Sequence, residues 1–182
     1  TKLTWDDIRP CLKDLVVALF QNIPTGVGSK GNLKLSAQDE RKVLQQGARW
    51  AVEHGYGFPE DLEATEDNGV IKNADPDKVS ARALERGRDQ LGTLGSGNHF
   101  LEIEVVEEIF DSPAAAAFGL EKGQVAVLIH SGSRGLGYQV CDDYLAEMVR
   151  HMGELDFPLP DRQLACAPLD SPQPLRVSTP TP

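Results

Sequence analysis

The residues with the clearest chemical potential lie at the end of a glycine-rich stretch. Residues 91 to 103 read LGTLGSGNHFLEI, in which three glycines lead directly into Asn98 and His99. A glycine-rich loop lets the backbone approach a ligand closely, whereas the strand that follows fixes the side chain at its start. A neutral imidazole held in this way is a suitable ligand for manganese, zinc, iron or nickel.

A second histidine occupies a comparable position. In residues 123 to 137, GQVAVLIHSGSRGLG, an apolar run ends at His130 and is followed by a loop that contains Arg134. This loop offers serine hydroxyls, exposed backbone N–H groups and a guanidinium, which can bind a phosphate through two parallel hydrogen bonds. Together the two segments predict a metal site beside a pocket for phosphate or another oxyanion.

Two other interpretations of these histidines stay open on chemistry alone. A histidine at the end of a strand is often a structural residue with a satisfied hydrogen bond. Two protein ligands are also fewer than the roughly three or four that usually hold zinc or a related metal. An unrelated metal-dependent hydrolase would therefore need a third ligand, such as Glu102, close to both His99 and His130.

The elements that must position these residues can be predicted from hydrophobic spacing and capping residues. Apolar residues at helical spacing follow a plausible N-cap at Thr4, and Ser36 with Asp39 forms a variant of the capping box. The continuous run Val125–Ile129 is typical of a strand buried on both faces, and Cys11 is expected in the core. We expect helices over 4–21, 36–54, 77–90 and 138–152, and strands over 99–105 and 125–129. The fold class is α+β, with helices flanking a sheet.

Three further features are less specific. The loop over residues 22–32, NIPTGVGSKGN, is either a connector or a phosphate-facing loop to which Lys30 adds charge. Arg82 and Arg86 lie one turn apart, as on a solvated helix face, and could also bind phosphate. Five carboxylates between Glu60 and Asp67 fit a solvated loop better than a metal site.

Composition restricts the function classes. The 182 residues carry a net charge of −10, which argues against a broad surface that coats nucleic acid. No apolar run approaches the roughly 18 residues needed to cross a bilayer, so no membrane association is expected. The three cysteines, Cys11, Cys141 and Cys166, are spaced neither as a disulfide framework nor as a zinc finger. A reducing, cytoplasmic location is therefore the expectation.

The same motifs resemble a known family. GTLGSGNHFLEI (92–103) and IHSGSRGLG (129–137) are similar to two signature segments of the RtcB family of RNA-splicing ligases. The similarity extends upstream through PTGVGSKG (24–31) and ADPDKVSARALERGRDQLGT (74–93), and downstream through LPDRQLACAPLDSP (159–172). It therefore covers nearly the whole chain, and the pairing of GNHFLE with HSGSRG is highly specific.

The resemblance implies an RtcB-like fold and a defined reaction. RtcB-like enzymes join RNA 2′,3′-cyclic phosphate or 3′-phosphate ends to 5′-hydroxyl ends in tRNA splicing and RNA repair, with GTP and two Mn²⁺ ions. The implied partners are RNA (tRNA halves or broken RNA), GTP and an archease-like activating protein. By motif, His99 would ligate one Mn²⁺ and His130 the other, Asn98 would contact the guanylate phosphate, and Arg134 would lie near the RNA or nucleotide phosphate.

The chain also departs from the family pattern. The family's Asp-x-x-Cys metal segment has no counterpart here, because Asp7 and Cys11 are four residues apart rather than three. No counterpart is found for the third metal histidine or for the guanylylated histidine. We therefore expect residues 1–172 to be the central portion of an RtcB-like catalytic domain and 173–182 a divergent, disordered tail. Alone, the chain is expected to be inactive, with a non-catalytic binding module as the alternative.

Overall fold

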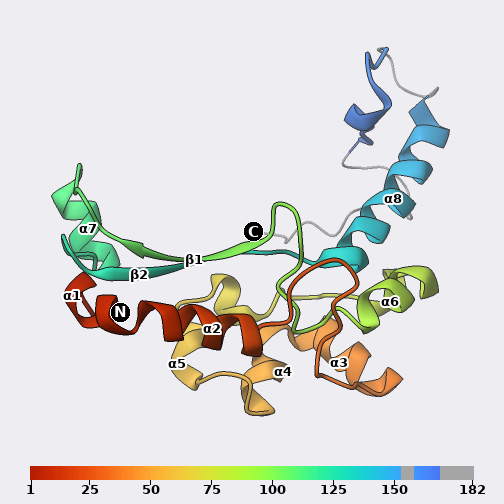
Figure 1. Cartoon of the computed structure of the whole chain (residues 1–182). Helices are drawn as coiled ribbons and strands as arrows, with labels where there is room; N and C mark the ends of the chain where they lie inside the picture. Colours follow the sequence, from red (N-terminus) through yellow and green to blue (C-terminus); the bar gives the residue numbers. More distant parts are fainter. Residues whose placement is uncertain (153–157, 169–182) are drawn as a thin grey trace. The chain divides into compact units, whose positions relative to one another are not determined.

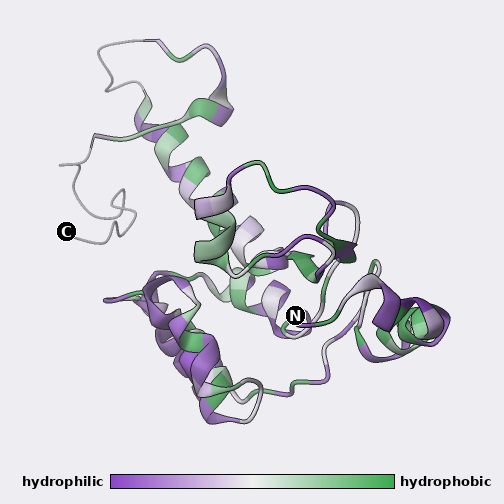
Figure 2. Ribbon diagram, turned by 90° about the vertical axis from the view of Figure 1, so that its left-hand side faces the viewer, coloured by the Kyte–Doolittle hydropathy of each residue, from purple (hydrophilic) through white to green (hydrophobic). Residues whose placement is uncertain are grey.

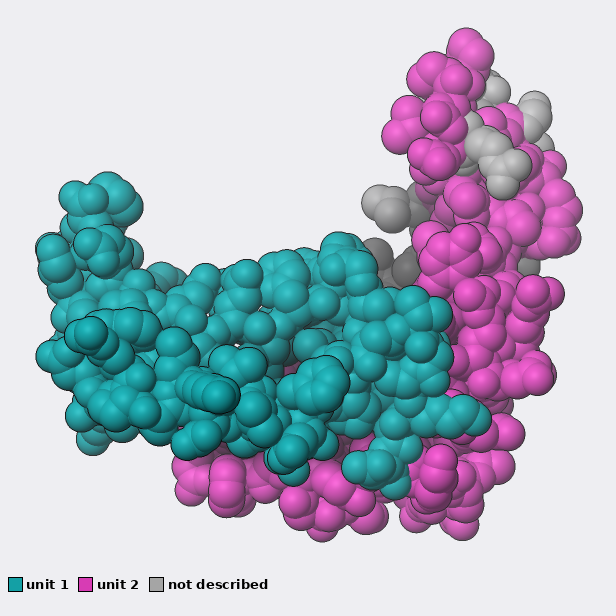
Figure 3. Space-filling view, viewed as in Figure 1, with its two compact units in different colours: residues 1–32, 90–134 teal, residues 33–89, 135–182 magenta. Residues whose placement is uncertain are grey.

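The computed structural model describes residues 1–152 and 158–168, and it divides the chain into two compact units. Unit 1 comprises Thr1–Asn32 and Gln90–Arg134, and unit 2 comprises Leu33–Asp89 and Gly135–Pro182 (Figure 3). Each unit is therefore built from two separate stretches of sequence. The expected tail over 173–182 lies outside the described residues.

Unit 1 contains a two-stranded antiparallel sheet with short helices at its side (Figure 1). Strand β1 spans Phe100–Val105 and β2 spans Val125–His130, and helix α7 (Ser112–Phe118) lies in the connection between them. The two strands and the mixed α+β class confirm the prediction. Exposed and half-buried side chains alternate along β1, and the half-buried ones begin with Leu101.

The N-terminal helix of unit 1 is interrupted near Pro10. Helix α1 spans Trp5–Ile8, a 3-10 turn (η1) spans Arg9–Cys11, and α2 spans Leu12–Asn22. Proline lacks an N–H and cannot continue the hydrogen-bond ladder, so the single predicted helix becomes two. The predicted N-cap holds, because the Thr4 N–H donates to the Asp7 carboxylate at 2.8 Å. The prediction of a core position for Cys11 is wrong, since that thiol is exposed.

Burial of β2 differs from the prediction. Val125 is buried, but the strand becomes exposed toward its end, and Ile129 is 62% exposed. Full burial of an apolar strand requires neighbours on both faces. Within the described part of the chain this strand has a single partner strand, so the two-sided burial of Val125–Ile129 is not observed.

Unit 2 is helical in its described part. Its first stretch contains α3 (Ala37–Gln46), α4 (Ala48–Glu53), α5 (Pro59–Glu63), 3-10 turns η2 (Glu66–Gly69) and η3 (Pro76–Lys78), and α6 (Ala81–Arg88). Helix α8 (Arg134–His151) begins at the boundary of the units, and a 3-10 turn (η5) spans Arg162–Leu164. Apolar and polar residues are interspersed along the helical ribbons (Figure 2). In the described ranges, no helix combines the length and apolar character needed to span a membrane.

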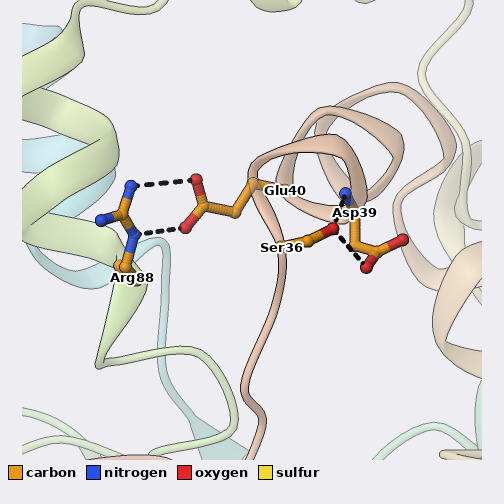
Figure 4. Close-up of polar contacts among 4 residues, drawn as sticks. All are labelled: Ser36, Asp39, Glu40 and Arg88. Carbon is orange, nitrogen blue, oxygen red and sulfur yellow. Dashed lines mark hydrogen bonds and ion pairs between the residues drawn. The ribbon is translucent and has the colours of Figure 1, made fainter.

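Capping and ion pairing fix the start of α3. The Ser36 hydroxyl accepts from the Asp39 N–H at 3.2 Å and donates to the Asp39 carboxylate at 2.7 Å, as predicted from sequence (Figure 4). Glu40 on the next position forms an ion pair with Arg88 of α6, with Nε and Oε1 2.6 Å apart. This pair links two helices that the sequence separates by a long turn-rich segment.

Candidate functional site

The strand register brings the two candidate histidines to one end of the sheet. Phe100 is the cross-strand partner of His130, and His99 immediately precedes Phe100. The backbones of His99 and His130 are therefore neighbours, although their loops are separated in sequence. On one face of the sheet the His130 ring stacks on the Phe100 ring, with centroids 5.2 Å apart and planes 16° from parallel.

Three loops of unit 1 meet at this end of the sheet. A parallel bridge joins Thr25 to Gly95, and the Gly26 N–H donates to the Gly95 carbonyl at 2.8 Å. The Leu94 N–H donates to the Pro24 carbonyl at 2.9 Å. The Leu94 carbonyl accepts from the Ser131 hydroxyl at 2.7 Å. The loop over 22–32 and the loop after β2 are thus both tied to the glycine-rich stretch.

Gly95 brings the side chains of His99 and Arg134 together. It is buried and has φ +123°, a conformation that L side chains rarely adopt. A Cβ at this position would overlap Arg134 Nη1 and would lie 2.7 Å from His99 Cγ. The absence of a side chain at Gly95 therefore creates the space in which the imidazole and the guanidinium pack.

Several polar atoms around these loops are buried without a partner. His99 Nδ1, Arg134 Nε and Ser29 Oγ have no hydrogen bond among the described residues. Leaving a buried polar group unpaired costs about 1–3 kcal/mol. Arg134 also has a positive φ of 53°, a strained conformation that often occurs at functional sites. These atoms are therefore candidates to form a hydrogen bond with a bound ligand.

The four histidines divide into two classes by the state of Nδ1. In His54 this nitrogen is 2.7 Å from the Trp50 carbonyl, and in His151 it is 3.0 Å from the Glu147 carbonyl. Each of these contacts spans one helical turn, so both histidines have a structural role. Within the described ranges neither His99 nor His130 has such a contact, which favours a ligand-binding role for these two.

Other candidates take different positions. Asn98 is exposed on the loop beside His99. Arg86 donates to Gln139 Oε1 at 2.9 Å and lies 5.0 Å above the Tyr138 ring, so it has structural partners within unit 2.

Ser29 was not singled out from sequence. The only signal that pointed to it was its place in the loop over 22–32, for which a phosphate-facing role was one interpretation.

The described residues do not complete a metal site. No group of three or more histidine, cysteine, aspartate or glutamate side chains in residues 1–152 and 158–168 could hold a metal ion. Cys11, Cys141 and Cys166 are all exposed and free. The third ligand that an unrelated hydrolase would need near both His99 and His130 is thus not found in these ranges.

Comparison with known proteins gives the wider context. Residues 1–176 match the model of the family described as tRNA-splicing ligase RtcB. The chain is 56% identical over 170 residues to the tRNA-splicing ligase RtcB of Pyrobaculum aerophilum, which covers 93% of this chain and 35% of that protein. It is 50% identical over 171 residues to that of Archaeoglobus fulgidus, covering 94% and 36% respectively.

The relative from Methanocaldococcus jannaschii is 53% identical over 171 residues, which cover 94% of this chain and 18% of that protein. The chain thus spans between 18% and 36% of the length of these relatives. Identity at this level over nearly all of the chain is far above what an accidental match produces. The sequence motifs, the mixed α+β fold and the comparisons agree, and the chain belongs to the RtcB family of tRNA-splicing ligases.

Proposed function

We propose that this chain supplies part of the active site of an RNA ligase that uses GTP and Mn²⁺. The reaction joins an RNA 2′,3′-cyclic phosphate or 3′-phosphate end to a 5′-hydroxyl end, in tRNA splicing and RNA repair. The observation that supports this most directly is the meeting of three motif loops around Gly95, where His99 Nδ1 and Arg134 Nε are left without partners.

In this proposal each motif residue has a distinct task. The Arg134 guanidinium binds a phosphate of the RNA or nucleotide, because its positive charge and planar donors match phosphate oxygens. Ser29 Oγ, which is buried without a partner, can add a hydroxyl donor, and the exposed Asn98 amide contacts the guanylate phosphate. His99 and His130 provide imidazole ligands for the two Mn²⁺ ions.

The metal chemistry depends on residues beyond those described here. Bound divalent ions would neutralise phosphate charge and stabilise developing negative oxygens. Because the described residues offer no complete donor set, the remaining Mn²⁺ ligands and the guanylylated histidine come from other parts of the longer family polypeptide. An archease-like activator would act on that complete enzyme, and the isolated chain would not be guanylylated.

A segment exchange tests the proposal. Residues 1–172 would replace the matching segment of the Archaeoglobus fulgidus relative, and ligation of RNA with 3′-phosphate and 5′-hydroxyl ends would be measured with GTP and Mn²⁺. We expect the chimera to ligate, and His99→Ala and His130→Ala to reduce its rate by at least about 100-fold, as for loss of essential catalytic groups. His151→Gln is the matched control, because its ring contacts the Glu147 carbonyl.

Three outcomes would contradict the proposal. A folded chimera that ligates RNA equally well with and without the His99 and His130 imidazoles would remove these residues from the active site. Incubation of the unmodified 182-residue chain with labelled GTP and Mn²⁺ is the second arm. A stable covalent GMP adduct on this chain would show that it already contains the nucleotide acceptor. A folded chimera that does not ligate would favour the binding module instead.

A further inference from the structure

The His130 imidazole is held by a ring stack rather than by a hydrogen bond. Its ring lies nearly parallel to that of Phe100, its direct cross-strand partner, with 5.2 Å between centroids. Both side chains are exposed at the end of the sheet. In the described ranges, neither ring nitrogen of His130 has a hydrogen-bond partner. The stack is therefore the contact that restricts the orientation of this imidazole.

A second histidine in the chain shows what a purely structural stack looks like. The His54 ring stacks on Trp50 at 4.1 Å, and its Nδ1 also contacts the Trp50 carbonyl at 2.7 Å. One of its nitrogens is thus occupied. Phe100 has no polar atom in its side chain, so its stack restricts the His130 ring while leaving both nitrogens at the ring edge available.

Orientation matters for an imidazole that binds a metal. A metal ligand is most effective when its ring plane and tautomer are fixed in advance, and outer contacts usually provide this. An exposed histidine at a strand end would otherwise sample several rotamers about χ1 and χ2. Stacking of two flat rings removes part of that freedom, since rotating the imidazole away would expose the apolar face of Phe100.

We propose that Phe100 is a positioning residue, which holds the His130 imidazole by stacking so that its edge nitrogens are presented to a divalent cation. This inference rests on the proposed function, in which His130 is a Mn²⁺ ligand, and adds to it the residue that orients the ligand. Phe100 itself touches neither cation nor substrate in this role.

Nuclear magnetic resonance of the 182-residue chain, labelled at histidine, tests the inference. Without metal, stacking shifts the His130 ring protons upfield. We expect this shift to be lost in Phe100→Leu and kept in Phe100→Tyr. On titration with Mn²⁺, the concentration that half-broadens the His130 signals should rise about tenfold in Phe100→Leu, the low end for outer contacts of metal ligands, and stay unchanged in Phe100→Tyr.

Phe110→Leu is the matched control, because Phe110 is 89% exposed and makes no ring contact with a histidine among the described residues. It should alter neither reading. Circular dichroism establishes that each variant is folded. Loss of the upfield shift without any change in Mn²⁺ broadening would overturn the inference, since the stack would then be structural only. An unchanged shift in Phe100→Leu would overturn it as well.

The two proposals fail in different ways. If Mn²⁺ broadens the His130 signals neither in the unchanged chain nor in the chimera that contains the remaining ligands, His130 is not a ligand, and both the metal assignment and this inference are wrong. If the unchanged chain is broadened and Phe100→Leu behaves identically, the ligand assignment stands and only the positioning role is wrong.

Discussion

At the scale of single residues, Gly95 shapes the geometry of the candidate site, because His99 and Arg134 approach its backbone closely. Glycine is required at this position for two separate reasons: its φ is +123°, and Arg134 and His99 approach it closely. Gly97, two residues further along the same loop, has a φ of +72° but open space where a Cβ would lie. Comparing alanine substitutions at the two positions therefore distinguishes the free-energy cost of backbone strain from that of steric overlap.

We predict that Gly95→Ala is considerably more destabilising than Gly97→Ala. A positive φ costs a non-glycine residue about 1–2 kcal/mol, which applies to both variants. Overpacking at Gly95 adds about 1–3 kcal/mol, because the added methyl group overlaps the half-buried side chains of Arg134 and His99. Urea unfolding of the chain gives the free energy of each variant. Equal losses at the two positions would show that Arg134 and His99 do not pack against Gly95 as described.

The sequence allowed the principal site candidates to be named but not their mutual contacts. Motif similarity singled out His99 and His130, and the register confirms that both lie at one end of the sheet. Ser29 was missed, because its buried hydroxyl depends on how the loop over 22–32 folds onto the glycine-rich stretch. Contacts between loops arise from tertiary structure, which residue type and spacing do not specify.

At the scale of elements, a polar network joins α6 to α8 within unit 2. The Ser80 hydroxyl, which also caps α6, donates to Asp143 Oδ2 at 2.6 Å. Gln139 is only 6% exposed; its amide donates to Asp143 Oδ1 at 2.8 Å and its carbonyl oxygen accepts from Arg86. The hydrogen bonds from Ser80 and then Gln139, with the nearby positive charge of Arg82, lower the pKa of Asp143 below its ordinary value.

This network predicts an acid-dependent loss of stability. Because the pKa of Asp143 is lowered in the folded state, the unfolded chain binds a proton more readily. The stabilisation is present above the ordinary carboxyl pKa and is lost as the pH falls through the lowered value. Asp143→Asn should therefore lower the urea midpoint at neutral pH and flatten its decline between about pH 5 and pH 2.

Asp142→Asn is the matched control for that measurement. It removes the same charge from the neighbouring position of α8, where the side chain is exposed and has no hydrogen-bond partner among the described residues. The control should retain the acid-dependent decline. If Asp143→Asn and Asp142→Asn follow the same curve, the hydrogen bonds to Asp143 do not contribute to the pH dependence.

Local sequence patterns predicted the first residues of helices better than they predicted the points at which helices are interrupted. Ser36 and Thr4 start helices as expected, because a cap is a local interaction. The helix expected over 36–54 instead breaks at Gly47, whose φ is +53° and where an added Cβ would overlap the Gly69 carbonyl oxygen. The break depends on a segment about twenty residues away in sequence, so periodicity alone could not reveal it.

At the scale of the whole molecule, the described residues leave much apolar surface uncovered. Among the described residues the buried apolar side chains are Ile8, Trp50, Ala83 and Val125, a small core for a chain of this length. In unit 1, a groove of about 360 Å³ lies between α2 and β1, lined by Leu15, Leu19, Ile23, Leu101 and Ile103 among others. The relatives are roughly three or more times as long as the matched segment.

This exposed surface leads to a prediction for the isolated chain. Phe20 and Leu19 of α2 both line the groove, but the Phe20 side chain is 81% exposed whereas the Leu19 side chain is half-buried. Phe20→Ser should leave the free energy of unfolding nearly unchanged, because water already surrounds the ring. Leu19→Ser should lower it by about 1–2 kcal/mol, since burial of such a side chain is partly lost.

The dye 8-anilinonaphthalene-1-sulfonate gives an independent reading, because it fluoresces on exposed apolar surface. The unchanged chain should bind it strongly in the absence of denaturant, and Phe20→Ser should reduce the signal by removing an exposed ring. Leu19→Ser should increase the signal instead, as weaker packing between α2 and β1 admits the dye. A large loss of stability in Phe20→Ser would mean that the Phe20 ring is covered in solution, and the apolar face of α2 would then be part of a closed core.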